Sequence, residues 1–271
     1  MAHDKLVSGD ATKFVRKSAL AAAVLAAVSC SPAWAVGVFD FTTNQTLFFD
    51  NFESGNFASP AVGSWSLVGL DVNVTNASSP AAAQGTFYAS LFRNSDAFSQ
   101  GNLRGALSST PNSGDVIGFR MMVYIPSASD ADSRGQFILD TTDFTNAVAW
   151  ARPDGAGHVD AVTLGTVVVN TGLTYKTDTW QEWDLSYSIG ALTFGVCVDG
   201  TCASGFSSIA PGTFNQLDLF NGNRNEGSLF LDAVPSSATP LPAAFPLLAS
   251  GLGALGLLGW RRKKKAAALT V

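Results

Sequence analysis

Apolar residues in the middle of the chain, residues 36–235, recur in short runs separated by Gly, Pro, Asn, Asp and Ser. β-Branched and aromatic residues dominate these runs, and no window of a dozen residues keeps the 3.6-residue period of an amphipathic helix. The pattern predicts an all-β domain, an antiparallel β-sandwich or jelly roll. The expected strands lie at residues 46–49, 71–75, 87–92, 116–125, 136–139, 147–151, 162–169, 181–187, 192–198, 216–220 and 228–234.

The clearest alternation lies in the strand expected at 116–125. Its apolar residues from Phe119 to Ile125 occupy every second position and alternate with Arg120, Met122 and Tyr124. One face of this strand is therefore expected to lie in the core. Three later aromatic residues are expected to join that core: Trp180, Trp183 and Phe194.

The first 35 residues predict a secretory signal peptide. Basic residues precede the apolar run 19–28, and Ala33-Trp34-Ala35 offers small residues to a signal peptidase, with cleavage expected after Ala35. The apolar run is too short to span a bilayer. The alternative is a lipoprotein site at Cys30. The Sec translocon and signal peptidase are the expected partners of this segment.

The last 36 residues predict a membrane anchor. Residues 236–242 form a linker, and residues 243–260 carry no charge over a length that is just sufficient for a transmembrane helix. A basic cluster then fixes the tail, 261–271, on the cytoplasmic side and the sandwich outside. The cluster consists of Arg261, Arg262, Lys263, Lys264 and Lys265.

The segment before this helix carries a motif, Pro240-Leu241-Pro242-Ala243. Together with the glycine-rich apolar stretch and the basic tail, it resembles the VPLPA variant of the PEP-CTERM sorting signal, although Thr239 stands where that variant has Val. The resemblance implies recognition by an exosortase of a Gram-negative bacterium and transfer of the protein to the cell surface or extracellular matrix. A permanent single-pass anchor is the alternative.

Charge is divided unevenly along the chain. The whole chain has a net charge of −5, but nine of its 16 basic residues lie in the two ends, so residues 36–238 have a net charge of −12. So acidic a domain argues against nucleic-acid binding, which needs clustered Lys and Arg.

Once the signal peptide is removed on export, two cysteines remain, Cys197 and Cys202. An even number of cysteines in an exported protein favours a disulfide. Asp199-Gly200 between them predicts a two-residue hairpin that places the cysteines opposite each other.

Several segments run in an order that resembles the concanavalin A-like lectin/glucanase jelly roll in its laminin-G-like form. They are Asp50-Asn51-Phe52-Glu53-Ser54-Gly55, Phe119–Pro126, Trp180-Gln181-Glu182-Trp183, Leu192–Val198, Asp199-Gly200 and Leu229–Val234. The superfamily includes glycoside hydrolases, which need two carboxyl groups. Glu182 and Asp184 would share one strand face, but Tyr187 stands where the glucanase motif has its second Glu. We therefore assign no catalytic residue and expect no enzyme.

Acidic residues could instead hold structural calcium, a cation that prefers oxygen ligands. Asp50, Glu53 and Asp232 would converge if the first and last strands are neighbours. A second acidic cluster comprises Asp130, Asp132, Asp140 and Asp143. In both clusters the alternative is that Asp serves as a turn former and surface residue.

The superfamily resemblance implies carbohydrate binding. Four residues combine aromatic, amide and guanidinium groups suited to sugars: Trp150, Arg152, Asn223 and Arg224. The expected function is a non-catalytic surface or matrix protein that binds an extracellular polysaccharide or matrix component. The alternatives are a structural module without a specific ligand and, third, a glycan-processing enzyme that uses Glu182, Asp184 or Glu226.

Overall fold

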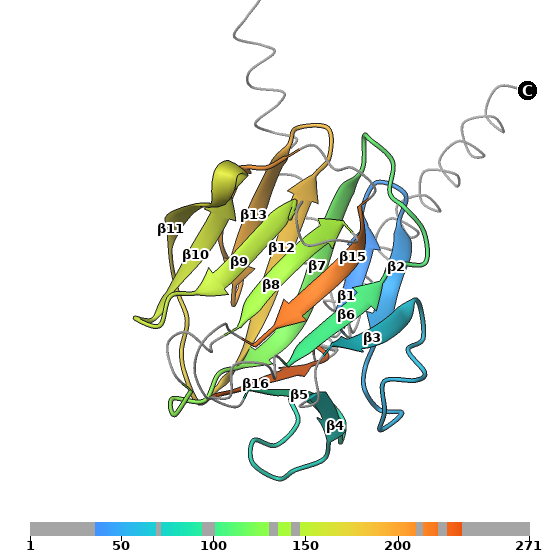
Figure 1. Cartoon of the computed structure of the whole chain (residues 1–271), viewed down its shortest axis with the longest axis vertical. Coiled ribbons are helices and arrows are strands. Elements are labelled where there is room, and N and C mark those ends of the chain that lie inside the picture. The colour runs from blue at the N-terminus through green and yellow to red at the C-terminus, as the bar shows by residue number, and fades with distance from the viewer. Residues whose placement is uncertain are drawn as a thin grey trace, which may run out of the picture. The chain divides into compact units, whose positions relative to one another are not determined.

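A computed structural model describes residues 36–68, 72–93, 101–129, 135–141, 147–209, 214–221 and 227–234 (Figure 1). The predicted signal peptide, sorting motif, transmembrane helix and basic tail lie outside these residues. Within the described ranges, no helix is long and apolar enough to cross a membrane.

Two antiparallel sheets make up this part of the chain and face each other as layers (Figure 1). The nine-stranded sheet has the order β14-β13-β12-β7-β16-β5-β4, with β1 paired to β7 and β2 paired to β1. Its strands are β1 (Val36–Asp40), β2 (Gln45–Asp50), β4 (Val72–Thr75), β5 (Tyr88–Arg93), β7 (Val116–Tyr124), β12 (Trp180–Ser188), β13 (Thr193–Val198), β14 (Thr201–Ser207) and β16 (Gly227–Asp232).

The seven-stranded sheet has the order β11-β10-β9-β8-β15-β6-β3. Its strands are β3 (Ser64–Val68), β6 (Asn102–Ala106), β8 (Gln136–Thr141), β9 (Ala149–Pro153), β10 (His158–Thr163), β11 (Val167–Thr174) and β15 (Phe214–Phe220). The all-β antiparallel sandwich predicted from the sequence is therefore confirmed.

The core lies between the two sheets. Trp183 of β12 is fully buried, and its ring centroid lies 5.0 Å from that of Phe137 on β8. The alternation predicted for 116–125 is confirmed, since Phe119, Met121, Val123 and Ile125 are all buried. Trp180 differs from the prediction. Because β12 points Trp183 into the core, Trp180 lies on the outer face of the sheet, where its Nε1 donates to the Ala81 carbonyl at 2.7 Å.

Strand β7 joins the first and last strands of the described domain. One edge of β7 pairs with β12 along its whole length. Its other edge is divided, because β1 pairs with residues 117–120 and β16 pairs with residues 122–124. Strands from the two ends of the sequence thus share one edge of β7.

Some strands differ from those predicted. The sequence pattern did not predict β1, β3, β6, β14 and most of β10. Of these, β6 and β14 combine few apolar residues with polar ones or glycine. The expected strand 162–169 is interrupted by a 3-10 turn, Leu164–Thr166, in which Thr166 has a φ of 61°. A β-branched residue rarely adopts this conformation, and the local signal for the break is Gly165 beside it.

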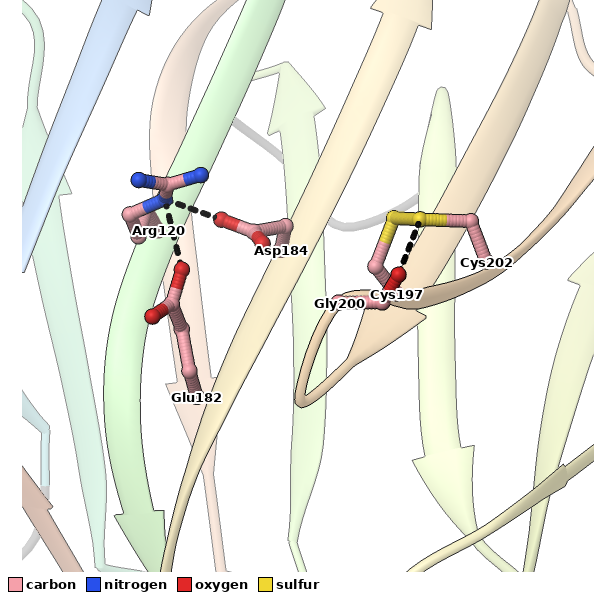
Figure 2. The surroundings of a disulfide bond; sticks show 6 residues. All are labelled: Arg120, Glu182, Asp184, Cys197, Gly200 and Cys202. Carbon is pink, nitrogen blue, oxygen red and sulfur yellow. Dashed lines mark hydrogen bonds and ion pairs between the residues drawn. A yellow bond between two sulfur atoms is a disulfide. The ribbon is translucent and has the colours of Figure 1, made fainter. Parts of the chain in front are cut away.

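The predicted hairpin at Asp199-Gly200 is confirmed. Both turn residues have positive φ, 48° and 76°, as a type I′ turn requires. Cys197 and Cys202 are register partners and form the predicted disulfide, with a Cα–Cα distance of 4.0 Å (Figure 2).

Replacing Trp183 should destabilise the sandwich strongly. Trp183→Ala leaves a large cavity between the sheets and is expected to lower the free energy of unfolding by roughly 3–5 kcal/mol. Leu192→Ala, at a position 37% exposed, is the control and should change it by less than about 0.5 kcal/mol. Urea denaturation of both variants measures the difference. Equal effects would contradict the placement of the core.

Candidate functional site on the outer face of the seven-stranded sheet

A row of side chains crosses the outer face of the seven-stranded sheet. Hydrogen-bonded register places five residues opposite one another on β9, β8, β15, β6 and β3: Trp150, Ile138, Asp218, Arg104 and Ser66. Their neighbours along the strands, such as Leu217 and Leu219, are buried in the core. Since successive side chains point to opposite faces, the row points away from the sandwich interior.

The polar half of the row is an ion pair between strands far apart in sequence. Arg104 Nε lies 3.1 Å from Asp218 Oδ1, and Gln216 Nε2 donates to Asp218 Oδ2 at 2.7 Å. The Asp218 side chain is fully buried, whereas that of Arg104 is 25% exposed. Burial raises the pKa of Asp218 to about 6, and the Asp140 charge adds to this rise, while Gln216 and Arg104 oppose it.

The aromatic half of the row is Trp150, with Arg152 two residues further along the same face of β9. Arg152 Nε lies 3.6 Å from Asp160 Oδ2 on the neighbouring strand β10. Burial raises the pKa of Asp160, and the Arg152 charge opposes that rise. Arg152 is the more exposed partner, so its guanidinium remains accessible at the surface.

Two buried polar atoms of this face have unused hydrogen-bonding capacity. Within the described residues, Trp150 Nε1 and Asn102 Oδ1 have no hydrogen-bond partner. Buried polar groups are normally paired, so unpaired ones on one face point to a polar partner outside the fold.

The structure thus places two of the four predicted ligand-binding residues, Trp150 and Arg152, on one face. The other two, Asn223 and Arg224, lie outside the described residues, as does Glu226. Sequence reasoning did not find Arg104 or Asp218. The only local signal was a charged residue between two core leucines, Leu217-Asp218-Leu219, where an acid is costly to bury.

Glu182 and Asp184 lie on the outer face of the other sheet and share one partner. Arg120 Nε lies 3.1 Å from Glu182 Oε1 and 2.5 Å from Asp184 Oδ1 (Figure 2). The predicted common face of the two carboxylates is confirmed. Burial raises the pKa of Asp184 to about 6, against the opposing effect of Arg120. Because a single guanidinium holds both carboxylates, the arrangement is that of a structural ion triad.

The three proposed calcium ligands do not meet at one point. Asp50 Oδ1 accepts from the Phe52 amide at 2.8 Å, and its Oδ2 accepts from Trp65 Nε1 at 2.5 Å. Burial raises the pKa of Asp232 to about 7, and the charge of Glu53 nearby adds to it. The fold therefore places Glu53 near Asp232, whereas the Asp50 carboxylate is bonded to Phe52 and Trp65 instead.

Backbone amides surround the Glu53 and Asp232 carboxylates. The Thr86 and Phe87 amides donate to Glu53 Oε1 at 2.9 and 3.0 Å, and the Gln84 amide donates to Asp232 Oδ2 at 2.9 Å. No three His, Cys, Asp or Glu side chains in the described ranges are close enough to share a metal ion. Of the second acidic cluster, Asp140 lies in β8, and Asp130, Asp132 and Asp143 lie outside the described residues.

Comparisons with known proteins give no family. No protein-family model and no curated protein matches the sequence. Similar solved structures include a sialidase, with 12% identity and a TM-score of 0.48, over 65% of this chain and 17% of that chain. A carbohydrate-binding module CBM66 from Bacillus subtilis has 11% identity and a TM-score of 0.39, over 65% and 98%. Lectin II from Ulex europaeus has 10% identity and a TM-score of 0.41, over 72% and 97%.

At these identities and TM-scores, the similarities assign neither a family nor a ligand. Membership of the concanavalin A-like superfamily therefore stays a prediction.

The buried carboxyls predict that stability falls as pH rises. Asp184 and Asp218 have a pKa of about 6 and Asp232 of about 7, above the usual 3.8, so the folded protein binds more protons than the unfolded chain. Their stabilising contribution is complete below pH 4 and is lost as pH rises through 6 to 7. The melting temperature should be several degrees higher at pH 5 than at pH 8.

Calorimetry across this range tests the prediction, with two variants for comparison. Asp218→Asn should reduce the pH dependence, whereas Asp178→Asn should not, because hydrogen bonding to Ser127 lowers the pKa of the exposed Asp178. A melting temperature that rises between pH 5 and pH 8 would contradict the prediction.

Proposed function

We propose that the protein is an exported, non-catalytic glycan-binding module whose ligand lies on the outer face of the seven-stranded sheet. The observation that carries the proposal is a pair of buried polar atoms without a hydrogen-bond partner on the face that also carries an aromatic ring, Trp150 Nε1 and Asn102 Oδ1. Sugar hydroxyls both donate and accept hydrogen bonds, so one ligand class satisfies both atoms. The apolar face of a sugar ring packs well on an indole.

Ion pairing prepares this face for a ligand. Arg104 orients Asp218, and Asp160 orients Arg152, so the polar groups are fixed before binding. A preorganised site loses less side-chain entropy when a ligand binds. The ion pairs therefore support recognition of a ligand by several directed hydrogen bonds.

Export is supported by the disulfide, which persists in oxidising compartments. The sequence patterns at the two ends of the chain indicate the route of export. In this proposal the Sec translocon and signal peptidase deliver the protein, and an exosortase recognises Pro240-Leu241-Pro242-Ala243 and transfers the sandwich from the inner membrane to the cell surface or matrix.

A second candidate function is glycoside hydrolysis by Asp140 and Asp218. The Asp140 charge raises the pKa of Asp218, which burial places at about 6, a value suited to a general acid. Hydrolysis also needs two carboxyl groups in reach of one glycosidic bond. Release of reducing ends from a bound polysaccharide, abolished by Asp218→Asn, would establish this alternative over simple binding.

Calcium remains part of the proposal as a structural ion. Glu53 and Asp232 are the residues that would hold it, because their adjacent carboxylates repel each other in the absence of a cation. Calcium should then raise the melting temperature of the wild-type protein relative to EDTA but leave that of Asp232→Asn unchanged. Equal melting temperatures of the wild type in calcium and in EDTA would remove calcium from the proposal.

Removing the Trp150 ring should abolish glycan binding without unfolding the domain. On a glycan array, Trp150→Ala is expected to weaken binding by roughly 10- to 100-fold, since a stacked aromatic residue is a typical hot spot. Trp180→Ala is the matched control, because Trp180 is also half-buried but lies on the outer face of the other sheet. Absence of binding by the wild type to any glycan would leave the structural module as the remaining hypothesis.

A further inference from the structure

Exposed apolar side chains gather at one end of the seven-stranded sheet. The described residues expose seven large hydrophobic side chains, and four of them lie within six consecutive positions, at Leu164 and Val167 to Val169. Val167 is 56% exposed and Val168 46%. Val167 and Val169 point to one face of the sheet and Val168 to the other, so this strand is exposed on both faces, as expected of an open edge.

These valines lie on an edge strand. β11 pairs with β10 along one edge, and in the described part of the chain no strand pairs with its other edge (Figure 1). An open edge is a template for another strand, and proteins usually protect it with charged residues, Pro or a β-bulge. β11 has a register shift after Asn170, but its regular part, Val167–Asn170, has neither charge nor Pro, because none lies between Asp160 and Lys176.

The neighbouring edge of the other sheet is also uncharged. β14 is the edge strand of the nine-stranded sheet and lies beside β11. No charged residue lies between Asp199 and Asp218. Two edge strands thus form one uncharged end on a domain whose net charge is −12 over residues 36–238.

We propose that β11 pairs edge to edge with β11 of a second copy of this chain and forms a two-fold symmetric dimer. Two copies with the same strong negative charge repel each other least where both are uncharged, so this end is the favoured contact. Antiparallel pairing of β11 with itself satisfies its open backbone groups. Pairing of its regular part, Val167–Asn170, also places Val168 of one copy opposite Val169 of the other, and such cross-strand pairs stabilise a sheet.

The two-fold symmetry of this dimer determines how the ligand faces of the two copies are oriented. The two-fold axis of an antiparallel strand pair is perpendicular to the sheet, so both copies present the Trp150 row on the same side of one continuous sheet. Dimerisation does not rest on the proposed function. If the face binds a polysaccharide, the dimer binds it at two points and gains avidity.

Sedimentation of the full, exported chain at micromolar concentration tests the proposal. The wild type is expected to sediment as a dimer and Val168→Lys as a monomer, because pairing of Val167–Asn170 with itself places the two lysines on either side of the two-fold axis. Leu67→Lys is the matched control and should remain dimeric, since Leu67 is 48% exposed on β3, the opposite edge of the same sheet. Mixing Val168→Lys with Val168→Asp should restore the dimer.

A second measurement needs no variant. Amide hydrogen exchange in residues 167–170 of the wild type should slow as protein concentration rises, whereas exchange in β3 should not change. A monomeric wild type, a Val168→Lys chain that dimerises like the wild type, or exchange independent of concentration would each overturn the proposal. None of these results depends on glycan-array binding, so the proposed function is tested independently of the dimer.

Discussion

The pairing of β7 with three other strands is the constraint on which the rest of the sandwich depends. β12 occupies one edge of β7, and β1 and β16 divide the other, so strands from both ends of the domain are fixed by one element. The same pairing points Trp183 of β12 toward the other sheet, where it meets Phe137 of β8. Because β8 also carries Ile138 on its opposite face, this core contact sets the position of the outer row that includes Trp150.

Buried charge is the second organising feature, and it occurs on both outer faces. Arg120 holds Glu182 and Asp184 on one sheet, and Arg104 holds Asp218 on the other. Removing charges from water is costly, so such pairs contribute little net stability and act mainly by fixing side-chain geometry. On the nine-stranded sheet, one guanidinium serves two carboxylates. On the seven-stranded sheet, Trp150 Nε1 and Asn102 Oδ1 lie on the same face as the ion pair and have no hydrogen-bond partner among the described residues, and these two atoms distinguish the candidate site from a structural ion pair.

Local patterns predicted the parts of the fold that depend on neighbouring residues. Alternation from Phe119 to Ile125 located a central strand, and Asp199-Gly200 located the hairpin that brings Cys197 to Cys202. Trp180 was misplaced because an aromatic residue carries the same local preference for either face of a strand, and only the register of β12 decides which face it takes. The polar strand β6 was missed because its sequence, Asn-Leu-Arg-Gly-Ala, has little apolar content of its own.

The sequence by itself determined that the middle of the chain forms antiparallel strands, where its clearest turn lies, and which cysteines pair. Those features follow from period-two alternation, turn chemistry and short chain separation, all of which are local. Only the tertiary structure decided that Arg104 meets Asp218, that Asp50 turns to Trp65 and away from Asp232, and that β11 is left at an edge. These outcomes depend on the order and register of strands far apart in sequence. The whole core sets that register at once, so no local pattern encodes it.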